Sequence, residues 1–391
     1  MKDETRIVVA GRDPESNHGV VNVPVYHAST ILFPSLKARK EAHAARAAGE
    51  RLVSYGRIGT PTTWSLEDAV AELEGGYRAQ VFPSGMAACA NAILAFVKAG
   101  DHILVLDTVY SPVRSFCDGY LKRFGVETTY YDPLIGAGIA DLMQPNTRLV
   151  YVEAPGSLTF EMQDIPAIAD VAHSRDALVV MDNTWASPLF FKPFAHGVDI
   201  SVQAGTKYIV GHSDVMIGIV TTTKDCWPVL QKGANLLGQT TGPDDAYLAL
   251  RGIRTLSVRL KQHMENAIAI AEWLKGRDEV AAVYHPALPD DPGHAIWKRD
   301  FLGSSGLFSF RLREVSEEVM AAFMDPLEFF GMGSSWGGYE SLILPADPTG
   351  VRTATKWDNR DPLIRIHVGL ESVDDLIADL EAGFDRLNAA K

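Results

Sequence analysis

Five short apolar runs with helical segments between them constrain the fold of this chain more than any other feature. The runs are rich in β-branched residues and nearly continuous, as in strands buried on both faces of a sheet. Helix-forming stretches, such as residues 86–98 and 164–173, lie between several of them. This alternation predicts an α/β protein with a mostly parallel sheet covered by helices. The runs span residues 102–106, 148–153, 178–182, 200–203 and 216–222.

The chain divides into three predicted parts. Residues 1–57 hold turn signals and one helix, from 36 to 51, with little apolar periodicity, so they are expected to form an arm that contacts a neighbouring subunit. Residues 58–250 carry the strand and helix alternation and form the large domain. Residues 251–391, rich in turns followed by a few strands, form a smaller α+β domain.

Three helices have recognisable signals. A capping box at Ser65 predicts a helix start there, and a long helix is expected over residues 244–274. Ser372 is expected to cap a terminal helix. The buried stripe of that helix recurs at helical spacing and comprises Val373, Leu376, Ile377, Leu380, Phe384 and Leu387.

Composition excludes several classes of function. The chain has 36 basic and 49 acidic residues, a net charge of −13, which argues against nucleic acid as the main ligand. Three scattered cysteines, Cys89, Cys117 and Cys226, are too few for a disulfide scaffold or a zinc cluster. No run of about 20 apolar residues or signal peptide is recognised. We therefore expect a cytoplasmic enzyme that binds no membrane.

A serine-hydrolase pattern occurs at residues 333–337, with Ser335 as the nucleophile. Asp358 or Asp361 and then His367 follow in the order of a hydrolase triad. However, a nucleophile elbow needs a strand before the serine and a helix after it, and a turn and a strand are expected after Ser335. We therefore set this interpretation aside.

Dinucleotide and metal sites are also weakly indicated. The nearest match to the dinucleotide motif, Gly136 with Gly138, lacks the third glycine. The close pairs His196 with Asp199 and His212 with Asp214 have no third ligand at recognisable spacing, so no metal is expected.

Another set of residues fits a single chemistry. Gly85 opens a helix whose N-terminus favours an anion. Asp182 ends one buried strand, and Thr206 and Lys207 follow the next, where an apolar setting lowers the pKa of a lysine. Pyridoxal phosphate needs a lysine, a carboxylate for its ring nitrogen and a phosphate site. Tyr110, after another strand, could stack on the ring.

Eight ordered segments resemble the pyridoxal-phosphate enzymes of cysteine and methionine metabolism. The likeness runs from about residue 5 to about residue 388. It implies the aspartate-aminotransferase-like fold, fold type I, assembled as a homotetramer that is a dimer of catalytic dimers. The segments are 55–62, 72–76, 82–88, 182–188, 203–214, 304–310, 335–342 and 363–371.

The resemblance assigns a role in cofactor binding to eight positions. Lys207 is similar to the Schiff-base lysine, Asp182 to the partner of the ring nitrogen, and Tyr110 to the tyrosine that stacks on the ring. Gly85 and Met86 match the backbone phosphate donors. Thr206 matches a residue that reaches the phosphate within the same chain. Tyr55 and Arg57 match residues that reach the phosphate of the neighbouring subunit.

The resemblance also implies a substrate site. Arg365 is similar to the arginine that grips the α-carboxylate of an amino-acid substrate, where a planar two-pronged donor fits well. Its neighbours in sequence alternate with it, which places Arg365 opposite the apolar face of its strand. Ser335 resembles a second carboxylate contact, and Tyr55 and Trp336 are expected beside the substrate. Lys207 and Tyr110 are the expected catalytic residues.

Local differences favour the β-lyase branch of the family. The γ-lyases, γ-synthases and sulfhydrylases typically read P-x-N-P near the cofactor, where this chain has Gly156 and Ser157. Those enzymes also carry a serine at the position of Ala204 and often a leucine at that of Trp336. The implied reaction is the cleavage of L-cystathionine to homocysteine, pyruvate and ammonia in methionine biosynthesis. Ser334 stands where the β-lyases tend to have tyrosine, which leaves the side-chain preference open.

Other functions remain as alternatives. The chain could be a methionine or cystathionine γ-lyase, or a β-lyase of broader cysteine S-conjugates. It could also be a cofactor-binding regulator without catalysis, although every matched polar residue is present.

Overall fold

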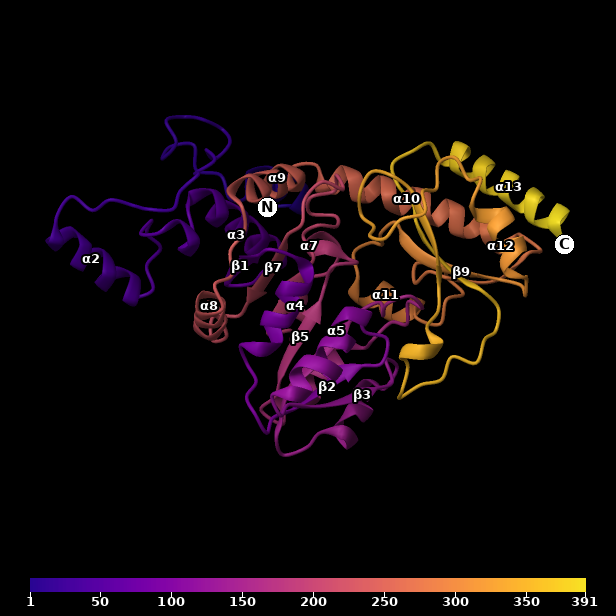
Figure 1. Cartoon of the computed structure of the whole chain (residues 1–391), viewed down its shortest axis with the longest axis horizontal. Coiled ribbons are helices and arrows are strands. Elements are labelled where there is room, and N and C mark those ends of the chain that lie inside the picture. Colours follow the sequence, from indigo (N-terminus) through magenta and orange to yellow (C-terminus); the bar gives the residue numbers. More distant parts are fainter.

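The computed structural model describes the whole chain, residues 1–391, and has a seven-stranded sheet in the larger domain (Figure 1). The order is β1-β7-β6-β5-β4-β2-β3. Strands β6, β5, β4, β2 and β3 are parallel, and β7 is antiparallel to both β1 and β6. The predicted α/β class is confirmed. The strands are β1 (Arg78–Phe82), β2 (His102–Leu106), β3 (Glu127–Tyr131), β4 (Thr147–Glu153), β5 (Leu178–Asp182), β6 (Ile200–Gln203) and β7 (Gly218–Thr222).

Helices pack on this sheet and bury its central strands. Helix α4 (Gly85–Leu94) packs on β6 and β7, and α6 (Ile165–His173) packs on β4 and β5. All five residues of β2 are buried, which explains its unbroken apolar sequence. The other elements are α3 (Pro61–Glu74), α5 (Ser111–Ser115), α7 (Ser187–Phe190), α8 (Trp227–Leu236), a π-helical turn (Phe116–Leu121) and 3₁₀ turns (Gly56–Ile58, Gly136–Leu142, Pro193–His196).

The smaller domain holds a four-stranded antiparallel sheet in the order β10-β11-β9-β8. The terminal helix buries Leu376, Leu380, Phe384 and Leu387 in the core of this domain, as the periodicity predicts. None of the helices combines the length and apolar character needed to cross a bilayer. Helix α9 (Pro243–Ile253) precedes this domain and packs on α3 of the large domain. The elements of the smaller domain are α10 (Leu256–Lys275), β8 (Val280–Tyr284), α11 (His294–Asp300), β9 (Leu307–Leu312), α12 (Glu317–Met324), β10 (Leu342–Ala346), a 3₁₀ turn (Thr349–Val351), β11 (Leu363–His367) and α13 (Val373–Ala390).

One predicted helix start is wrong, and one predicted capping hydrogen bond is missing. Helix α3 begins at Pro61 rather than at Ser65, because the Thr60 N–H donates to the Thr63 hydroxyl at 3.0 Å and proline suits the first helical turn. Ser372 directly precedes α13, but its side chain makes no capping hydrogen bond.

The long helix predicted over residues 244–274 is two helices. Helix α9 ends at Ile253 and α10 starts at Leu256. At the break, the Arg259 side chain donates a hydrogen bond of 2.7 Å to the carbonyl oxygen of Gly252. Because a buried guanidinium satisfies that carbonyl, the backbone does not need to continue the helical pattern there.

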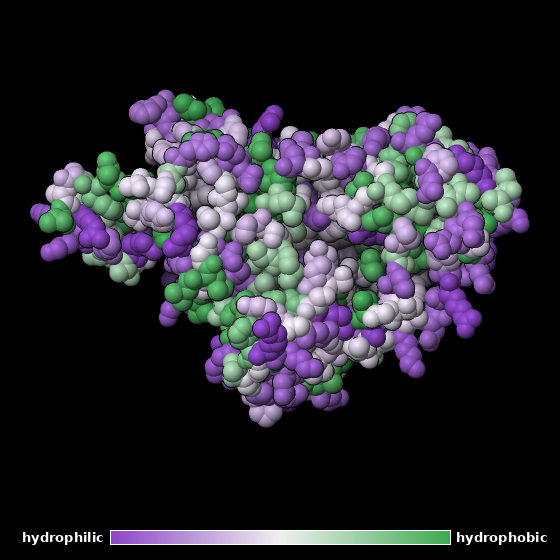
Figure 2. Space-filling view, in the orientation of Figure 1, coloured by the Kyte–Doolittle hydropathy of each residue, from purple (hydrophilic) through white to green (hydrophobic).

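The first 57 residues lie partly on the large domain and partly away from it. Helix α1 (Asp3–Val9) packs on α3 and buries Ile7. Helix α2 (Leu36–Ala47), by contrast, has no buried residue, and it projects from the body of the molecule (Figure 1). Leu32 is 88% exposed and Leu36 is 77% exposed. Apolar side chains therefore face outward on this projection, as the green atoms in Figure 2 show.

Candidate active site

The predicted carboxylate and lysine lie at neighbouring strand ends. Asp182 is the last residue of β5, and it pairs in register with Val202 of the parallel strand β6. Lys207 follows β6 by four residues. Since ligands bind at the carboxyl ends of parallel strands, this edge of the sheet is where a functional site is expected.

Asp182 is buried and has few hydrogen-bond donors. The Thr184 hydroxyl donates to its Oδ1 at 2.5 Å, and the Thr184 backbone N–H donates to the same atom at 3.0 Å. The other oxygen, Oδ2, has only the Cys89 thiol, 3.8 Å away. Burial raises the pKa of Asp182, while the Thr184 bonds and the charge of Lys207 act in the opposite direction. Oδ2 is therefore free to bind a protonated ring nitrogen.

Lys207 is poised to exchange a proton near neutral pH. Burial, together with the charge of Arg365, lowers the pKa of Lys207 to about 8. Its Nζ donates to the Ser335 hydroxyl at 2.6 Å and lies 5.2 Å from the centre of the Trp336 ring. Gly337 has a φ of +85°, and a Cβ there would lie 3.0 Å from the backbone of Lys207, so only glycine allows this close approach.

The start of helix α4 is a candidate anion site. The Ser84 side chain caps the helix by accepting from the Ala87 N–H at 3.1 Å. The backbone N–H groups of Gly85 and Met86 belong to the first turn, so they have no acceptor within the helix and can bind a phosphate. A Cβ on Gly85 would lie 2.6 Å from that of Ala204, which explains the need for glycine.

Thr206 lies beside this anion site, but its hydroxyl is already engaged. It accepts from the Ile217 N–H at 2.9 Å and lies 3.2 Å from the Ile217 carbonyl oxygen. The hydroxyl proton could turn from that carbonyl to a phosphate. Together, the free N–H groups, the under-bonded carboxylate of Asp182 and the amine of Lys207 fit pyridoxal phosphate.

Arg365 lies at the centre of β11 and points to the same place. Its neighbours Ile364 and Ile366 are fully buried, whereas Arg365 is half-buried on the other face of the strand. Its Nη2 donates to the Ser335 carbonyl oxygen at 3.2 Å. Ser335 therefore contacts Lys207 through its side chain and Arg365 through its backbone. The guanidinium keeps other donors for a substrate carboxylate.

Tyr110 is held by a residue that the sequence reasoning missed. The Tyr110 N–H donates at 2.8 Å to the carboxylate of Glu153, which ends β4 next to Asp182 in register. Burial first, and then the charge of Asp182, raise the pKa of Glu153 well above its usual range. The Tyr110 side chain itself is 44% exposed, and burial of its hydroxyl region raises its pKa.

Besides Glu153, the sequence reasoning missed Ser84 and Cys89. Ser84 had a readable signal, because a serine before a helix is a common cap. Glu153 also had one, since it ends a buried strand as Asp182 does. Cys89 had none: it is an ordinary buried helix residue in the sequence, and only the fold brings it to Asp182.

Tyr55 and Arg57 do not join this cluster within one chain. Tyr55 precedes the 3₁₀ turn Gly56–Ile58 and is exposed. The Arg57 guanidinium donates to the Asn235 carbonyl oxygen of α8 at 3.1 Å. Neither side chain makes a hydrogen bond to the other predicted site residues.

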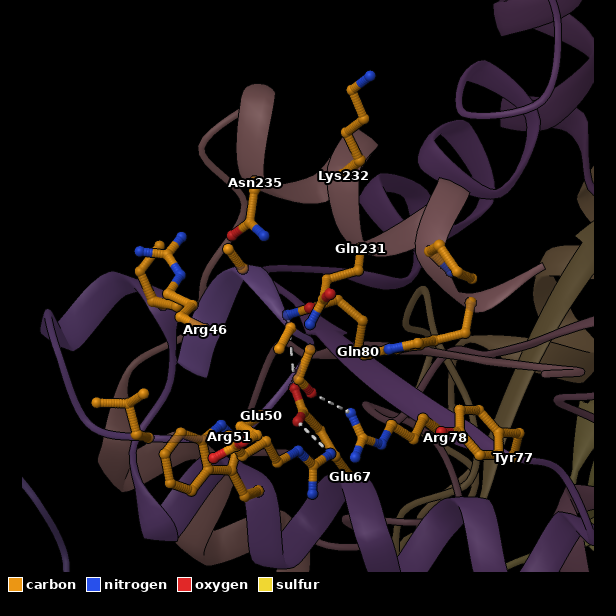
Figure 3. A pocket seen from close by; sticks show the side chains of 18 of the residues that line it. Arg46, Glu50, Arg51, Glu67, Tyr77, Arg78, Gln80, Gln231, Lys232 and Asn235 are labelled. Carbon is orange, nitrogen blue, oxygen red and sulfur yellow. Dashed lines mark hydrogen bonds and ion pairs between the residues drawn. The ribbon is translucent and has the colours of Figure 1, made fainter. Parts of the chain in front are cut away.

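A hollow of about 810 Å³ lies between the arm and the large domain (Figure 3). In it, Glu67 accepts hydrogen bonds from the Arg51 side chain and the Val81 N–H, each at 3.2 Å. Burial raises the pKa of Glu67 to about 7. The hollow contains neither Asp182 nor Lys207, so it is separate from the candidate active site.

The hydrolase pattern around Ser335 has no triad geometry. The Ser335 hydroxyl is bonded to Lys207, and a turn rather than a helix follows it. Both ring nitrogens of His367 are occupied, since Nε2 accepts from the Gly337 N–H at 3.0 Å and Nδ1 lies 3.1 Å from the Glu340 carbonyl oxygen. His367 is therefore a buried structural residue.

Comparisons with known proteins agree with this geometry. The family described as "Cys/Met metabolism PLP-dependent enzyme" matches residues 4–385. Cystathionine beta-lyase of Escherichia coli is 49% identical, over 99% of this chain and 99% of its own length. An L-alanine/L-glutamate racemase of Wolbachia pipientis wMel is 42% identical, over 99% and 98%.

A solved structure shows the same fold. Cystathionine gamma synthase from Xanthomonas oryzae pv. oryzae, in complex with aminoacrylate and cysteine, superimposes with a TM-score of 0.90 at 35% identity, covering all of both chains. The predicted resemblance and the predicted cofactor, pyridoxal phosphate, are confirmed. The chain belongs to the pyridoxal-phosphate-dependent enzymes of cysteine and methionine metabolism.

Proposed function

We propose that the chain is a carbon–sulfur β-lyase that cleaves L-cystathionine to homocysteine, pyruvate and ammonia. The observation that carries the proposal is the pairing of buried Asp182 with Lys207, whose pKa is about 8, at adjacent strand ends. The 49% identity to the E. coli cystathionine beta-lyase supports the choice of substrate. The reaction yields homocysteine, the precursor that methionine biosynthesis requires.

Five residues would hold the cofactor. Asp182 would bind the ring nitrogen, Gly85 and Met86 the phosphate, Tyr110 the ring face, and Lys207 the aldehyde carbon. Bound pyridoxal phosphate would supply an electron sink for the charge that develops at the substrate Cα. The −13 net charge of the chain does not describe this site, which gathers the basic groups that two anions require.

Lys207 is the base in the proposed mechanism. Arg365 binds the substrate α-carboxylate through its free N–H groups and so fixes the position of Cα. The Lys207 amine then takes the Cα proton, which a group with a pKa of about 8 does efficiently near neutral pH. The Ser335 hydroxyl, 2.6 Å from Nζ, orients the amine, and Trp336 covers it.

The departing sulfur needs a proton. Lys207 can return the proton that it has taken, and the Tyr110 hydroxyl is the other candidate. Because the pKa of Tyr110 is raised, that hydroxyl keeps its proton and can act as a donor.

Product analysis tests the proposal. The purified enzyme, loaded with pyridoxal phosphate, is given L-cystathionine, and pyruvate and 2-oxobutyrate are measured separately. β-Cleavage gives one pyruvate for each homocysteine. Predominant 2-oxobutyrate would instead identify a γ-lyase, and turnover of other cysteine S-conjugates alone would identify a broader β-lyase.

A second activity, amino-acid racemisation, is favoured by one relative. The Wolbachia racemase is 42% identical over almost the whole chain. Racemisation of an amino acid without a leaving group requires Lys207 to take the Cα proton and a second group, for which the Tyr110 hydroxyl is the candidate, to donate a proton to the opposite face. Formation of D-alanine from L-alanine would support this activity, and exchange of the Cα proton with retention of configuration would exclude it.

We further propose that the chain is a cytoplasmic homotetramer, a dimer of catalytic dimers. Tyr55 and Arg57 lie on the arm, and Leu32 and Leu36 of the same arm are exposed apolar residues, as expected of a surface that a second copy covers. Lys207→Ala and Arg57→Ala subunits can be mixed and reassembled. If Arg57 completes the neighbour's site, activity returns, and if each site is complete within one chain, the mixture shows only the parents' activities.

A further inference from the structure

A long connection links the two domains beside the candidate active site. Strands β10 and β11 are antiparallel neighbours, yet residues 347–362 separate them. Part of this connection, residues Arg352–Thr355, crosses to the large domain, and we call it the strap. Because β11 carries Arg365 immediately after the connection, the strap joins the substrate half-site of the small domain to the cofactor half-site.

The first anchor of the strap is Asp107, directly after β2. Its carboxylate is buried and accepts from the backbone N–H groups of Thr353, Ala354 and Thr355 at 2.9, 3.1 and 2.7 Å. The Thr355 hydroxyl donates at 2.8 Å, and Arg114 donates to Oδ1 at 2.6 Å. This many donors outweigh burial and lower the pKa of Asp107.

The second anchor is Arg352. Its guanidinium binds Glu161 at 2.9 Å and also the Thr159 hydroxyl, and it lies 5.3 Å from the centre of the Trp357 ring. The Arg352 side chain is only 6% exposed, so these are not ordinary surface pairs.

Both anchors lead to Tyr110. Asp107 lies three residues before it, and Arg114, which binds Asp107, lies four residues after it. The loop that holds Thr159 and Glu161 is also joined to the tyrosine loop, since the Ser157 N–H donates to the Thr108 carbonyl oxygen at 2.7 Å. The strap therefore contacts the tyrosine segment at Asp107, before Tyr110 in the sequence, and at Arg114, after it.

We propose that the strap fixes the position of Tyr110 relative to Arg365, and that Asp107 and Arg352 are positioning residues for substrate recognition. The proposal rests on the proposed function, because it takes Tyr110 and Arg365 as the two sides of one substrate site. A displacement of about 1 Å between such groups is enough to reduce turnover strongly. Neither positioning residue touches the substrate.

Hydrogen exchange of the apoprotein tests the contact without substrate. In Arg352→Ala, we expect the amides of Thr353–Thr355 and of the Tyr110 segment to exchange at least about tenfold faster. Asp347→Asn is the matched control, because Asp347 accepts from the Thr349 N–H at 2.8 Å in the same connection without reaching the large domain. Faster exchange in the strap alone, with the Tyr110 segment unchanged, would overturn the proposal.

Kinetics test the role through Tyr110. Arg352→Ala should lower kcat/KM for the amino-acid substrate by about tenfold, and Arg352→Lys should restore part of the loss. In a Tyr110→Ala background, Arg352→Ala should have little further effect, because its influence passes through the tyrosine. Equal losses in both backgrounds would contradict a positioning role.

A second pair of variants guards against misfolding. Thr355→Val removes only the hydroxyl donor to Asp107, while Asp107→Asn changes the acceptor itself. Each single variant should lower kcat/KM less than the combined variant, Arg352→Ala with Thr355→Val. Wild-type kinetics in the combined variant would overturn the proposal. The hydrogen-exchange results do not depend on which substrate the enzyme uses. Failure of the lyase assignment can therefore be distinguished from failure of the strap proposal.

Discussion

Two buried aspartates at the carboxyl edge of the same sheet differ in their hydrogen-bond donors and in the direction of their pKa shifts. Asp182 ends β5, and Asp107 follows β2 by one residue. Thr184 donates two hydrogen bonds to Asp182, and the Cys89 thiol lies 3.8 Å from its other oxygen. The pKa of Asp182 is raised. Asp107 receives three backbone N–H groups, hydroxyls and a guanidinium, and its pKa is lowered.

The contrast separates a candidate cofactor-binding carboxylate from a structural one. Burial disfavours a charge, and only enough donors reverse that cost. At Asp107 the chain supplies the donors, so the carboxylate is fully used in joining two domains. At Asp182 the chain leaves one oxygen nearly unbonded, so a ligand can complete it. A buried acid with unused acceptors, beside a lysine of lowered pKa, is therefore the stronger indication of a site.

The largest expected effect comes from the cations that face the two acids. Lys207→Ala should lower kcat at least about 10⁴-fold, since it removes the base and the cofactor link together. It should also abolish the absorbance band of the bound cofactor, while thermal unfolding of the apoprotein changes little. Arg114→Ala, the counterpart at Asp107, should mainly lower the unfolding temperature. Parental turnover by Lys207→Ala would refute the assignment.

Asp182→Asn should have the next largest effect. The amide cannot keep the ring nitrogen protonated, so kcat should fall about 10² to 10³-fold, as for loss of one preorganised electrostatic contact. Because the buried carboxylate has a raised pKa in the folded state, its ionised form opposes folding at neutral pH. Calorimetry of the apoprotein should therefore show no loss of stability. A variant that unfolds much more easily would place Asp182 among the structural acids.

Asp107→Asn should lower stability, in addition to the loss of kcat/KM expected for a positioning residue. The amide nitrogen would face N–H groups that now bind an oxygen, and disruption of a buried charged network of this kind costs about 2 to 3 kcal/mol. The folded-state pKa of Asp107 lies below its ordinary value of 3.8. Its stabilisation is thus present above that pH and is lost as pH falls through the folded pKa. Urea unfolding of the parent and of Asp107→Asn at neutral and acidic pH measures both effects. If the two free energies of unfolding differed by the same amount at every pH, the pKa of Asp107 would not be lowered in the folded state.

The smallest expected effect is the shift in the pKa of the Lys207 amine on folding. In the apoprotein its amine should become reactive as pH rises through about 8, well below the ordinary lysine value of 10.5. Acylation of Lys207, quantified by mass spectrometry across a pH series, gives the midpoint. The same peptide in the denatured chain provides the reference. A midpoint above 10 in the folded chain would show that burial does not tune this lysine.

The sequence predicted the location of Asp182, the candidate cofactor acid, better than the contacts of Asp107. Asp182 and Lys207 follow apolar runs, and parallel strands carry their ends to one edge, so a local pattern predicts a global location. The contact of Asp107 with Thr353 joins residues 246 positions apart, and no local pattern encodes such a contact. The break between α9 and α10 escaped prediction for a different reason: Arg259 is only seven residues from Gly252, but the hydrogen bond that it donates comes from the next helix and leaves no periodic signal.

The titration of the two aspartates tests the account most directly. Carbon-13 NMR of apoprotein labelled at aspartate, with resonances assigned from Asp182→Asn and Asp107→Asn, gives each pKa. The account predicts that Asp182 titrates above the ordinary value of 3.8 and Asp107 below it. If Asp182 titrated below Asp107, the nearly unbonded oxygen of Asp182 would not mark the cofactor site, and the account would be wrong.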